Sequence, residues 1–324
     1  MKKRLHHFIY RGFLFLSFCV ILSRSSYAQH ITLGGEGLKV EVGINFGPTF
    51  FLGDLGGHRG YGTTFVKDLN MPLTKFMKGA FVGVYPNDWL GFRLAGQLTY
   101  LEGKDVIIRT DGTNELYRKF RNLDVKTDVW EVYSAIEFFP LMFINRDEED
   151  QPKLRPYVFG GLGIFHFNPQ GSLADANGNK TWYALQPLHT EGQGFTEYPD
   201  KKPYKLTQLN IPLGAGLKYF LYGNVNLGLE LLYRKTFTDY IDDVSTTYID
   251  PSLFNKYLSP ADANIAIQIH DKSAGVYTRT DPGLQRGNPK NFDAYFSFLF
   301  KVGIQLNSNN NSREADQRRC PARF

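Results

Sequence analysis

Few residues in this chain have the types and spacing that chemistry requires. The histidines after the first 28 residues are scattered, and no two have the spacing of a metal-binding motif: they are His30, His58, His166, His189 and His270. We therefore expect no metal site and no cofactor.

A partial calcium loop begins at Asp175, where Asn177 and Asn179 continue an alternating series of oxygen ligands. Such a loop needs a glycine at its sixth position and a glutamate at its twelfth, and this chain has Lys180 and Gln186 there. An ordinary turn around Asn177 is the better interpretation.

Two acidic residues, Glu131 and Glu137, share one face of a predicted strand. They are six residues apart, about 20 Å at 3.3 Å per residue, which is too far to flank one glycosidic bond. A serine and histidine pair is the other catalytic possibility, but His166, the only histidine on a predicted strand, has no evident serine partner. We expect no enzymatic activity.

The first 28 residues have the pattern of a secretory signal peptide. Basic residues occupy positions 2–4, an apolar run follows at 13–22, and residues 26–28 offer a cleavage site between small side chains. The apolar run is too short to cross a membrane as a helix. Lipidation at Cys19 is disfavoured, because the bulky Phe18 stands where a lipoprotein signal needs a small residue.

The charge balance changes once this segment is removed. The whole chain has 37 basic and 32 acidic residues, but five of the basic residues lie in the first 28, where no acidic residue occurs. The remaining chain has 32 residues of each sign, so no basic excess indicates a nucleic-acid partner. It keeps one cysteine, Cys320, which can form an intermolecular disulfide or remain a free thiol; both interpretations stay open.

Alternation of apolar and polar residues predicts two strands in residues 206–237, joined by a tight turn at 222–224. Leu209 and Leu213 lie on one face of the first arm and Lys218 on the other. Each arm has about the 9–11 residues that a tilted strand needs to cross a bilayer. Similar patterns predict six further strands, at residues 38–51, 76–85, 90–102, 128–139, 155–167 and 292–306.

Short and long connections alternate between these strands. Pro251 and Pro260 each follow a capping residue, so they predict short helices in the longest connection. The strand at 155–167 is apolar on both faces, which leaves its outward side open. The long connections occupy residues 53–75, 104–127, 168–205 and 238–291.

No run of about 18 apolar residues follows the signal, so we expect no membrane-spanning helix. Export and alternating strands together predict an all-β fold, an eight-stranded antiparallel transmembrane β-barrel with long outer loops, surrounded by the lipids of the cell outer membrane. The predicted organisation is a signal peptide at 1–28, a barrel at 29–306 and a periplasmic C-terminal tail at 307–324.

An eight-stranded barrel is just wide enough for side chains to fill it. The inward faces carry charges of both signs, and buried charges must pair. We predict an ion-pair network across the lumen and no open pore; the members of the network are Glu41, Arg93, Glu131, Glu137, Lys218, Glu230, Arg234, Asp293 and Lys301.

The most specific sequence pattern is the run at 238–251. Together with residues 51–55 and 209–214, it resembles the PorG-like outer-membrane barrels of the Bacteroidetes type IX secretion system, over essentially the whole chain after the signal. The motif residues are Gly53, Asp54, Asp242, Asp243, Ser245, Thr246, Thr247, Tyr248, Asp250 and Pro251.

The resemblance implies an accessory of a machine for protein transport and gliding motility. In that role the barrel would anchor a periplasmic ring, built from a lipoprotein and its ring partner, to the outer membrane. The resemblance further implies that Cys320, on a tether of about 14 residues, forms a disulfide near the lipid anchor of the ring lipoprotein. Two alternatives stay open: a general OmpX-like surface barrel that binds ligands through its outer loops, and a lipid-modifying outer-membrane enzyme.

Overall fold

The structure is a computed structural model of the 324-residue chain, and it describes residues 38–56, 71–108, 116–144, 152–221, 224–275 and 279–306. The predicted signal peptide, the turn residues 222 and 223, and the tail 307–324 with Cys320 lie outside the described residues. Those three assignments therefore remain predictions.

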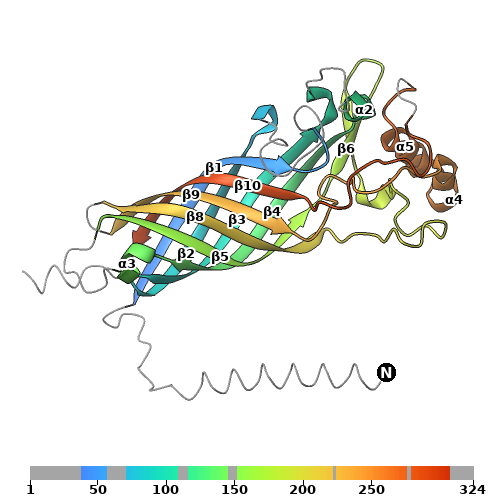
Figure 1. The fold of residues 1–324 in the computed structure, drawn as a ribbon. Helices are drawn as coiled ribbons and strands as arrows, with labels where there is room; N and C mark the ends of the chain where they lie inside the picture. The colour runs from blue at the N-terminus through green and yellow to red at the C-terminus, as the bar shows by residue number, and fades with distance from the viewer. Residues whose placement is uncertain are drawn as a thin grey trace, which may run out of the picture. The chain divides into compact units, whose positions relative to one another are not determined.

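Eight antiparallel strands close into one barrel (Figure 1). The order around the barrel follows the chain except where a hairpin is inserted, and the pairing of the third strand with the fourth closes the circle. The prediction of an eight-stranded barrel is confirmed. The strands are β1 (Lys39–Leu52), β2 (Lys75–Asn87), β3 (Leu90–Lys104), β4 (Asp124–Phe138), β5 (Leu154–Phe167), β8 (Thr207–Phe220), β9 (Val225–Thr236) and β10 (Ala294–Gln305).

The predicted strands match these in place, and most ends differ by only one to three residues. β4 differs most, because it begins at Asp124 rather than at residue 128. The cause is the partner strand: β3 continues to Lys104, which pairs with Asp124. The predicted central hairpin is β8 and β9, where the amide of Leu221 donates to the carbonyl of Val225 at 3.0 Å.

The predicted loop at 168–205 contains a hairpin that the sequence did not reveal. Its strands are β6 (Gln170–Ala174) and β7 (Lys180–Ala184), followed by the short 3-10 helix η3 (Gln186–Leu188). The hairpin extends the barrel wall, because Val125 of β4 pairs with Gly171 of β6. Strands of five residues are too short for their alternation to stand out from that of a polar loop.

The helices lie in the connections between strands. Asp250 and Ser259 cap the two predicted helix starts, accepting hydrogen bonds from the amides of Ser252 at 2.9 Å and Asp262 at 3.2 Å, so both predictions are confirmed. The helices are η1 (Met71–Leu73), η2 (Asp105–Ile107), α2 (Leu116–Arg121), α3 (Pro140–Ile144), η4 (Pro251–Leu253), α4 (Phe254–Tyr257) and α5 (Pro260–His270). None of those in the described ranges is long and apolar enough to span a membrane.

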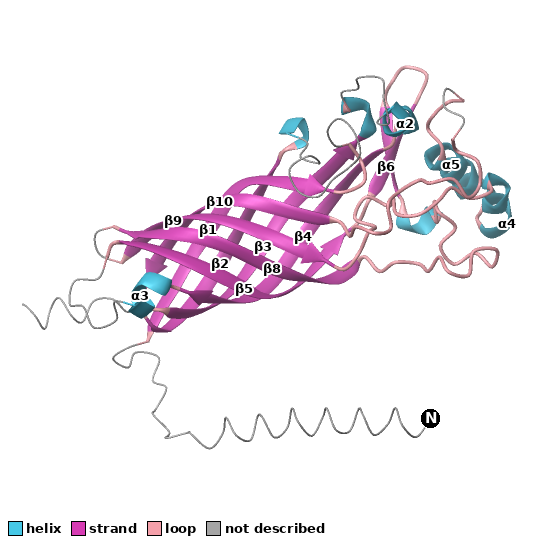
Figure 2. Cartoon of the chain, viewed as in Figure 1, coloured by secondary structure: helices cyan, strands magenta, loops and turns pink. Residues whose placement is uncertain are grey.

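The two ends of the barrel are built differently. Figure 2 shows α3 and the short turns at one end, and α2, α4, α5 and the long loops at the other. In an outer-membrane barrel the short turns face the periplasm and the long loops face outward. The start of β1 and the end of β10 therefore lie at the periplasmic end.

Side chains alternate between the outer wall and the lumen. On the wall, Ile44, Leu98 and Leu229 are each more than half exposed. β5, whose outward side the sequence left open, turns Leu162 outward and buries Phe165 inside. A closed barrel with an apolar wall satisfies its backbone hydrogen bonds internally and presents hydrocarbon outward, so this is an outer-membrane protein.

Candidate functional site

Eight of the nine predicted network residues lie inside the barrel. They comprise four carboxylates and four cationic side chains, and each residue is at most 3 % exposed. We call them the lumen network: Glu41, Arg93, Glu131, Glu137, Lys218, Glu230, Arg234 and Lys301.

The centre of the lumen network joins two acids to two bases. Arg93 lies 2.5 Å from Glu230 and 3.1 Å from Glu137. Lys301 lies 3.1 Å from Glu230 and 3.8 Å from Glu137. The Tyr157 hydroxyl donates a further hydrogen bond to Glu230 at 2.6 Å. Charges that have left water are therefore compensated in place, as burial requires.

Each end of the lumen network has its own pair. Towards the periplasm, the Lys218 ammonium lies 2.9 Å from the Glu41 carboxylate and donates to the Tyr85 hydroxyl at 2.8 Å. Towards the loops, the Arg234 guanidinium lies 3.1 Å from the Glu131 carboxylate. The lumen network thus extends over most of the barrel's length.

Aromatic rings fill the space between these ion pairs, a feature that we did not predict. Arg93 lies 4.4 Å from the ring centre of Phe159, and Lys301 lies 4.3 Å from that of Phe81. Such cation–π contacts stabilise charges in a low-dielectric interior. Phe159 is on the strand with two apolar faces, so only the closed barrel shows that it points inward.

Beyond the barrel, the outer loops pack into a second structure with its own hydrophobic core. We call it the loop cap; it comprises residues 53–56, 105–108, 116–123, 168–206, 238–275 and 279–293. The apolar side chains that form this core are Leu55, Leu123, Leu185, Leu188, Phe195, Val244, Ile249, Phe254, Ala263, Ala266 and Ile269, which pack with Val125 of β4. Connections that we predicted as loops are therefore a packed layer.

The buried side chain of Glu191 is the main polar hub of the loop cap. It accepts hydrogen bonds from the amides of Ser245 and Thr246, each at 3.0 Å. Arg286 also pairs with it, at 3.0 Å. Two motif residues of the predicted family are thus tied to a glutamate that no sequence pattern marked.

Other motif residues fasten further loop segments. Asp243 accepts from the Tyr204 hydroxyl at 2.7 Å and from Thr190, and burial raises the pKa of its carboxyl to about 6. Lys201 donates to the carbonyl of Thr247 at 2.8 Å. The amide of Tyr248 donates to a loop carbonyl at 2.9 Å. Asp250 and Pro251 start η4. These residues hold the loop cap together.

Asp293 departs from our prediction, because it lies outside the lumen network. It precedes the first residue of β10, and its carboxylate accepts from the amide of Ile241 at 2.7 Å. There it belongs to a group of aspartates where the loop cap meets the barrel. We call this group the mouth cluster: Asp54, Asp239, Asp242 and Asp293.

The mouth cluster brings the start of the motif next to its centre. Asp242 accepts from the amides of Asp54 at 2.9 Å and Leu55 at 3.2 Å. Gly53 packs so closely that an added Cβ atom would lie 2.7 Å from the Asp242 carboxylate. Burial, reinforced by neighbouring carboxylates, raises the pKa of Asp239 to about 9 and of Asp54 to about 6.

The other chemical candidates have ordinary surroundings. His166 lies 3.0 Å from the hydroxyl of Thr207, rather than near a serine, and stacks on Trp130. Asp175 accepts from the amides of Asn177 and Asn179, at 2.9 and 2.8 Å, as the predicted turn requires. Across the described ranges, no three His, Cys, Asp or Glu side chains are arranged to hold a metal ion.

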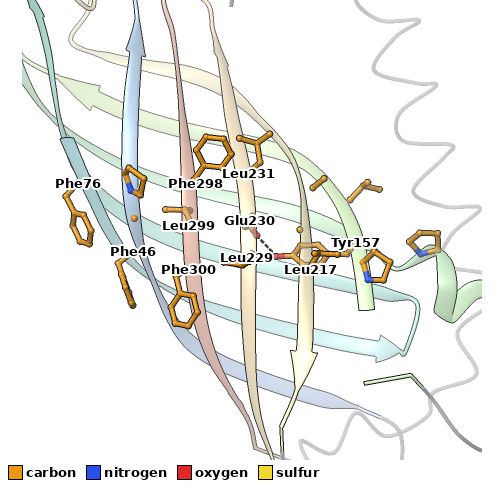
Figure 3. A pocket seen from close by; sticks show the side chains of 17 residues that line it. Phe46, Phe76, Tyr157, Leu217, Leu229, Glu230, Leu231, Phe298, Leu299 and Phe300 are labelled. Carbon is orange, nitrogen blue, oxygen red and sulfur yellow. Dashed lines mark hydrogen bonds between the residues drawn. The ribbon is translucent and has the colours of Figure 1, made fainter. Parts of the chain in front are cut away.

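The outer wall contains an apolar groove of about 760 Å³ (Figure 3). Phe46, Phe76 and Phe300 form one side, and Leu217 lies towards the other. The floor is the barrel wall itself, behind which the hydrogen bond between Tyr157 and Glu230 belongs to the lumen. The groove opens onto the lipid-facing wall, so bilayer hydrocarbon would fill it.

Neither a family model nor a curated protein matches this sequence. Several solved outer-membrane proteins are similar at low identity. Ail of Yersinia pestis is 9 % identical, with a TM-score of 0.32, over 83 % of this chain and 97 % of its own. Neisserial surface protein A is 10 % identical, with a TM-score of 0.31, over 83 % and 96 %. A major outer membrane protein of Thermus thermophilus is 11 % identical, with a TM-score of 0.35, over 83 % and 99 %. Likenesses this distant carry no argument about function.

Proposed function

We propose that this barrel anchors the periplasmic ring of a type IX protein secretion and gliding machine to the outer membrane. The observation that carries the proposal is the filled lumen, where ion pairs such as Arg93 with Glu230 and rings such as Phe159 occupy the bore. A filled barrel has no path for a solute, so its role belongs to its two ends and its wall. Anchoring needs only those surfaces.

The motif residues add support of a different kind. Those at 53–54 and 242–251 converge in the loop cap, where Asp54 contacts Asp242 and Ser245 contacts Glu191, whereas residues 209–214 lie in β8 of the barrel. Residues distant in sequence are thus joined in one structural unit. If PorG-like barrels share this loop structure, they need the same residue types at these positions to hold it together.

The tail offers a covalent attachment. Because β10 ends at the periplasmic end of the barrel, the chain after it begins on the side where a ring lipoprotein would lie. We place the partner disulfide at Cys320, with a cysteine near the lipid anchor of that lipoprotein as its partner. The ring partner would then be held indirectly.

Affinity purification tests the anchor directly. The tagged mature protein, extracted from its own outer membrane in mild detergent, should retain the ring lipoprotein, and a tagged OmpX-like barrel from the same cells should not. On non-reducing gels, Cys320→Ala should lose a high-mass band that the wild type shows. An unchanged band in Cys320→Ala would contradict the proposed disulfide. Absence of the ring lipoprotein from the purified sample would contradict the anchoring function.

A planar-bilayer recording tests the filled lumen separately. The purified barrel should show no large steady conductance, because Arg93, Glu137 and Glu230 occupy the bore. Large steady channels would contradict the absence of a pore and remove the main support for anchoring.

The loop cap favours one alternative, a surface barrel that binds ligands through its outer loops. Its packed core around Phe195 and Phe254 would make a rigid platform on the outer surface. The purification experiment separates the two functions, because only an anchor should retain periplasmic ring proteins.

A further inference from the structure

The mouth cluster contains four carboxylates and no cation of its own. None of Asp54, Asp239, Asp242 and Asp293 forms a salt bridge within the described part of the chain; Asp239, Asp242 and Asp293 are buried, and Asp54 is partly buried. An ionised carboxylate without a cation is unfavourable in such surroundings. Protons or a cation from the surrounding medium must therefore neutralise the cluster.

Hydrogen bonds hold the cluster together from three segments. The amide of Asp293 donates to the carbonyl of Thr238 at 3.0 Å, and the Asp293 carboxylate accepts from the amide of Ile241 at 2.7 Å. Residues 238–241 therefore wrap around Asp293. Asp54 joins from the loop after β1 through its amide, which donates to Asp242 at 2.9 Å.

The nearest basic side chains already have partners. Arg121 forms two hydrogen bonds with Asp105, at 2.7 and 2.9 Å, and Arg286 pairs with Glu191 at 3.0 Å. Each of these pairs is already electrically balanced. Neither arginine therefore compensates the cluster fully.

Asp239 differs from the other three members. Its residue is 5 % exposed, and neither carboxylate oxygen has a hydrogen-bond partner. The nearby side chain of Ser245 lowers the pKa of Asp239 but meets neither oxygen in hydrogen-bond geometry. By contrast, backbone amides hold Asp242, Asp293 and Asp54. A buried carboxylate with two oxygens that lack hydrogen bonds, beside three carboxylates held by backbone amides, could complete a cation site by a movement of its side chain.

We propose that the mouth cluster binds one divalent cation, Ca²⁺, from the external medium. Hard cations of this kind prefer carboxylate and carbonyl oxygens, and Ca²⁺ tolerates irregular geometry. A lysine or arginine of a partner protein is a poorer candidate, because the loop cap leaves too little of Asp239 and Asp242 exposed to admit one.

The ion would complete a site that is only partly assembled. Since no three acidic side chains of the described residues are already arranged to hold a metal, binding requires a movement. Asp239 is the member free to make it, because no hydrogen bond fixes its oxygens. Bound Ca²⁺ would then link Asp293, next to the start of β10, with the loop after β1 and residues 238–242, and so tighten the loop cap on the barrel.

Equilibrium dialysis of the full mature protein in detergent, with Ca²⁺ as the only probe, tests this inference. The wild type should bind about one ion with a Kd of roughly 0.1–1 mM, the range of extracellular calcium modules. Asp239→Asn should bind at least ~10-fold more weakly, since even changes outside the coordination shell cost that much. Asp281→Asn, which alters an exposed acid of the same loops, should bind like the wild type.

Hydrogen exchange distinguishes lost binding from lost folding. Without Ca²⁺, the amides of residues 238–245 should be at least as well protected from exchange in the Asp239→Asn variant as in the wild type, because the variant has one fewer repelling charge. With Ca²⁺, only the wild type and Asp281→Asn should gain protection there.

Three results would overturn the site. In dialysis, these are the absence of saturable Ca²⁺ binding by the wild type and binding by Asp239→Asn that equals that of the wild type. In hydrogen exchange, it is a gain of protection in the wild type at acidic pH that Ca²⁺ at pH 8 does not reproduce. The last result would mean that protons alone balance the cluster. Neither measurement involves the ring proteins, so failure here leaves the anchor untouched.

Discussion

The lumen network and the mouth cluster both bury carboxylates, but they balance them differently. In the lumen, four acids face four bases, and contacts such as Lys218 with Glu41 at 2.9 Å leave each charge with a partner. In the mouth cluster four acids face one another, and neither carboxylate oxygen of Asp239 has a partner in hydrogen-bond geometry. The membrane-spanning part is electrically complete, whereas the mouth depends on its surroundings.

The two regions differ in their access to water and to dissolved ions. The lumen network is enclosed by a wall that faces lipid, and its carboxylates are balanced by cationic side chains of the barrel itself. The mouth cluster lies beside loops that meet water, where protons and metal ions are available. A deficit of positive charge is therefore tolerable at the mouth and not in the lumen.

Breaking the lumen network should have the largest effect. Arg93→Met leaves Glu137 and Glu230 without their guanidinium partner, and removing one member of a buried ion pair costs ~3–5 kcal/mol. Reversible urea unfolding in lipid vesicles measures the loss. Lys235→Met, which removes an exposed cation from β9, should change stability by less than ~0.5 kcal/mol. Equal stability of both variants would show that the network does not stabilise the barrel.

Breaking the hub of the loop cap should have a smaller and local effect. Glu191→Ala leaves the Arg286 charge and the amides of Ser245 and Thr246 unpaired, at a cost of ~3 kcal/mol. Hydrogen exchange should show protection lost at 238–250 and kept in the eight barrel strands. Glu197→Ala, which breaks a surface pair with Lys256, should leave the protection of residues 238–250 unchanged. Loss of barrel protection in Glu191→Ala would mean that the two regions fold as one.

Acidification should loosen the loop cap through His270. Its Nδ1 lies 2.7 Å from the Thr190 carbonyl and its Nε2 is buried without a partner, so an added proton finds no acceptor. Burial, with the nearby Arg286 charge, lowers the pKa of His270 from 6.5 to about 4. Its contribution is therefore present above pH 6.5 and lost as the pH falls to about 4, by up to ~3 kcal/mol.

The carboxyls of Asp54 and Asp243 oppose this effect. Burial raises the pKa of each to about 6, so they favour the folded cap as the pH falls through that range. Comparing the pH dependence of cap protection in the wild type and in His270→Gln isolates the histidine. Parallel curves would contradict the role of His270.

The smallest expected effect concerns one helix of the loop cap. Ser259→Ala removes the side chain that accepts from the amide of Asp262 at 3.2 Å, and losing such a cap costs ~1 kcal/mol. Exchange should quicken in α5 and remain unchanged in the lumen strands. Ser259→Asp, which can still cap the helix, should keep the protection of the wild type.

The sequence alone determined the barrel and much of its inner and outer faces. A period of two places Leu229 outside and Glu230 inside whatever the neighbouring strand is, because successive side chains of a strand point to opposite faces. Eight strands make a bore narrow enough that the inward charges must pair. The same alternation of side chains assigns Arg93, Glu137 and Lys218 to the lumen without any knowledge of their partners.

Only the tertiary structure decided the partners and the loop cap. Arg93 and Glu230 are 137 residues apart, so strand order and stagger, rather than local pattern, bring them together. Phe159 lies on a strand whose two faces are both apolar, so only the pairing of that strand in the closed barrel determines which face points inward. Glu191 lies outside any periodic segment, so its position depends on loop packing, which leaves no periodic trace in a sequence. Asp293 fell within the predicted alternation, but β10 begins one residue later and the loop packs around its carboxylate.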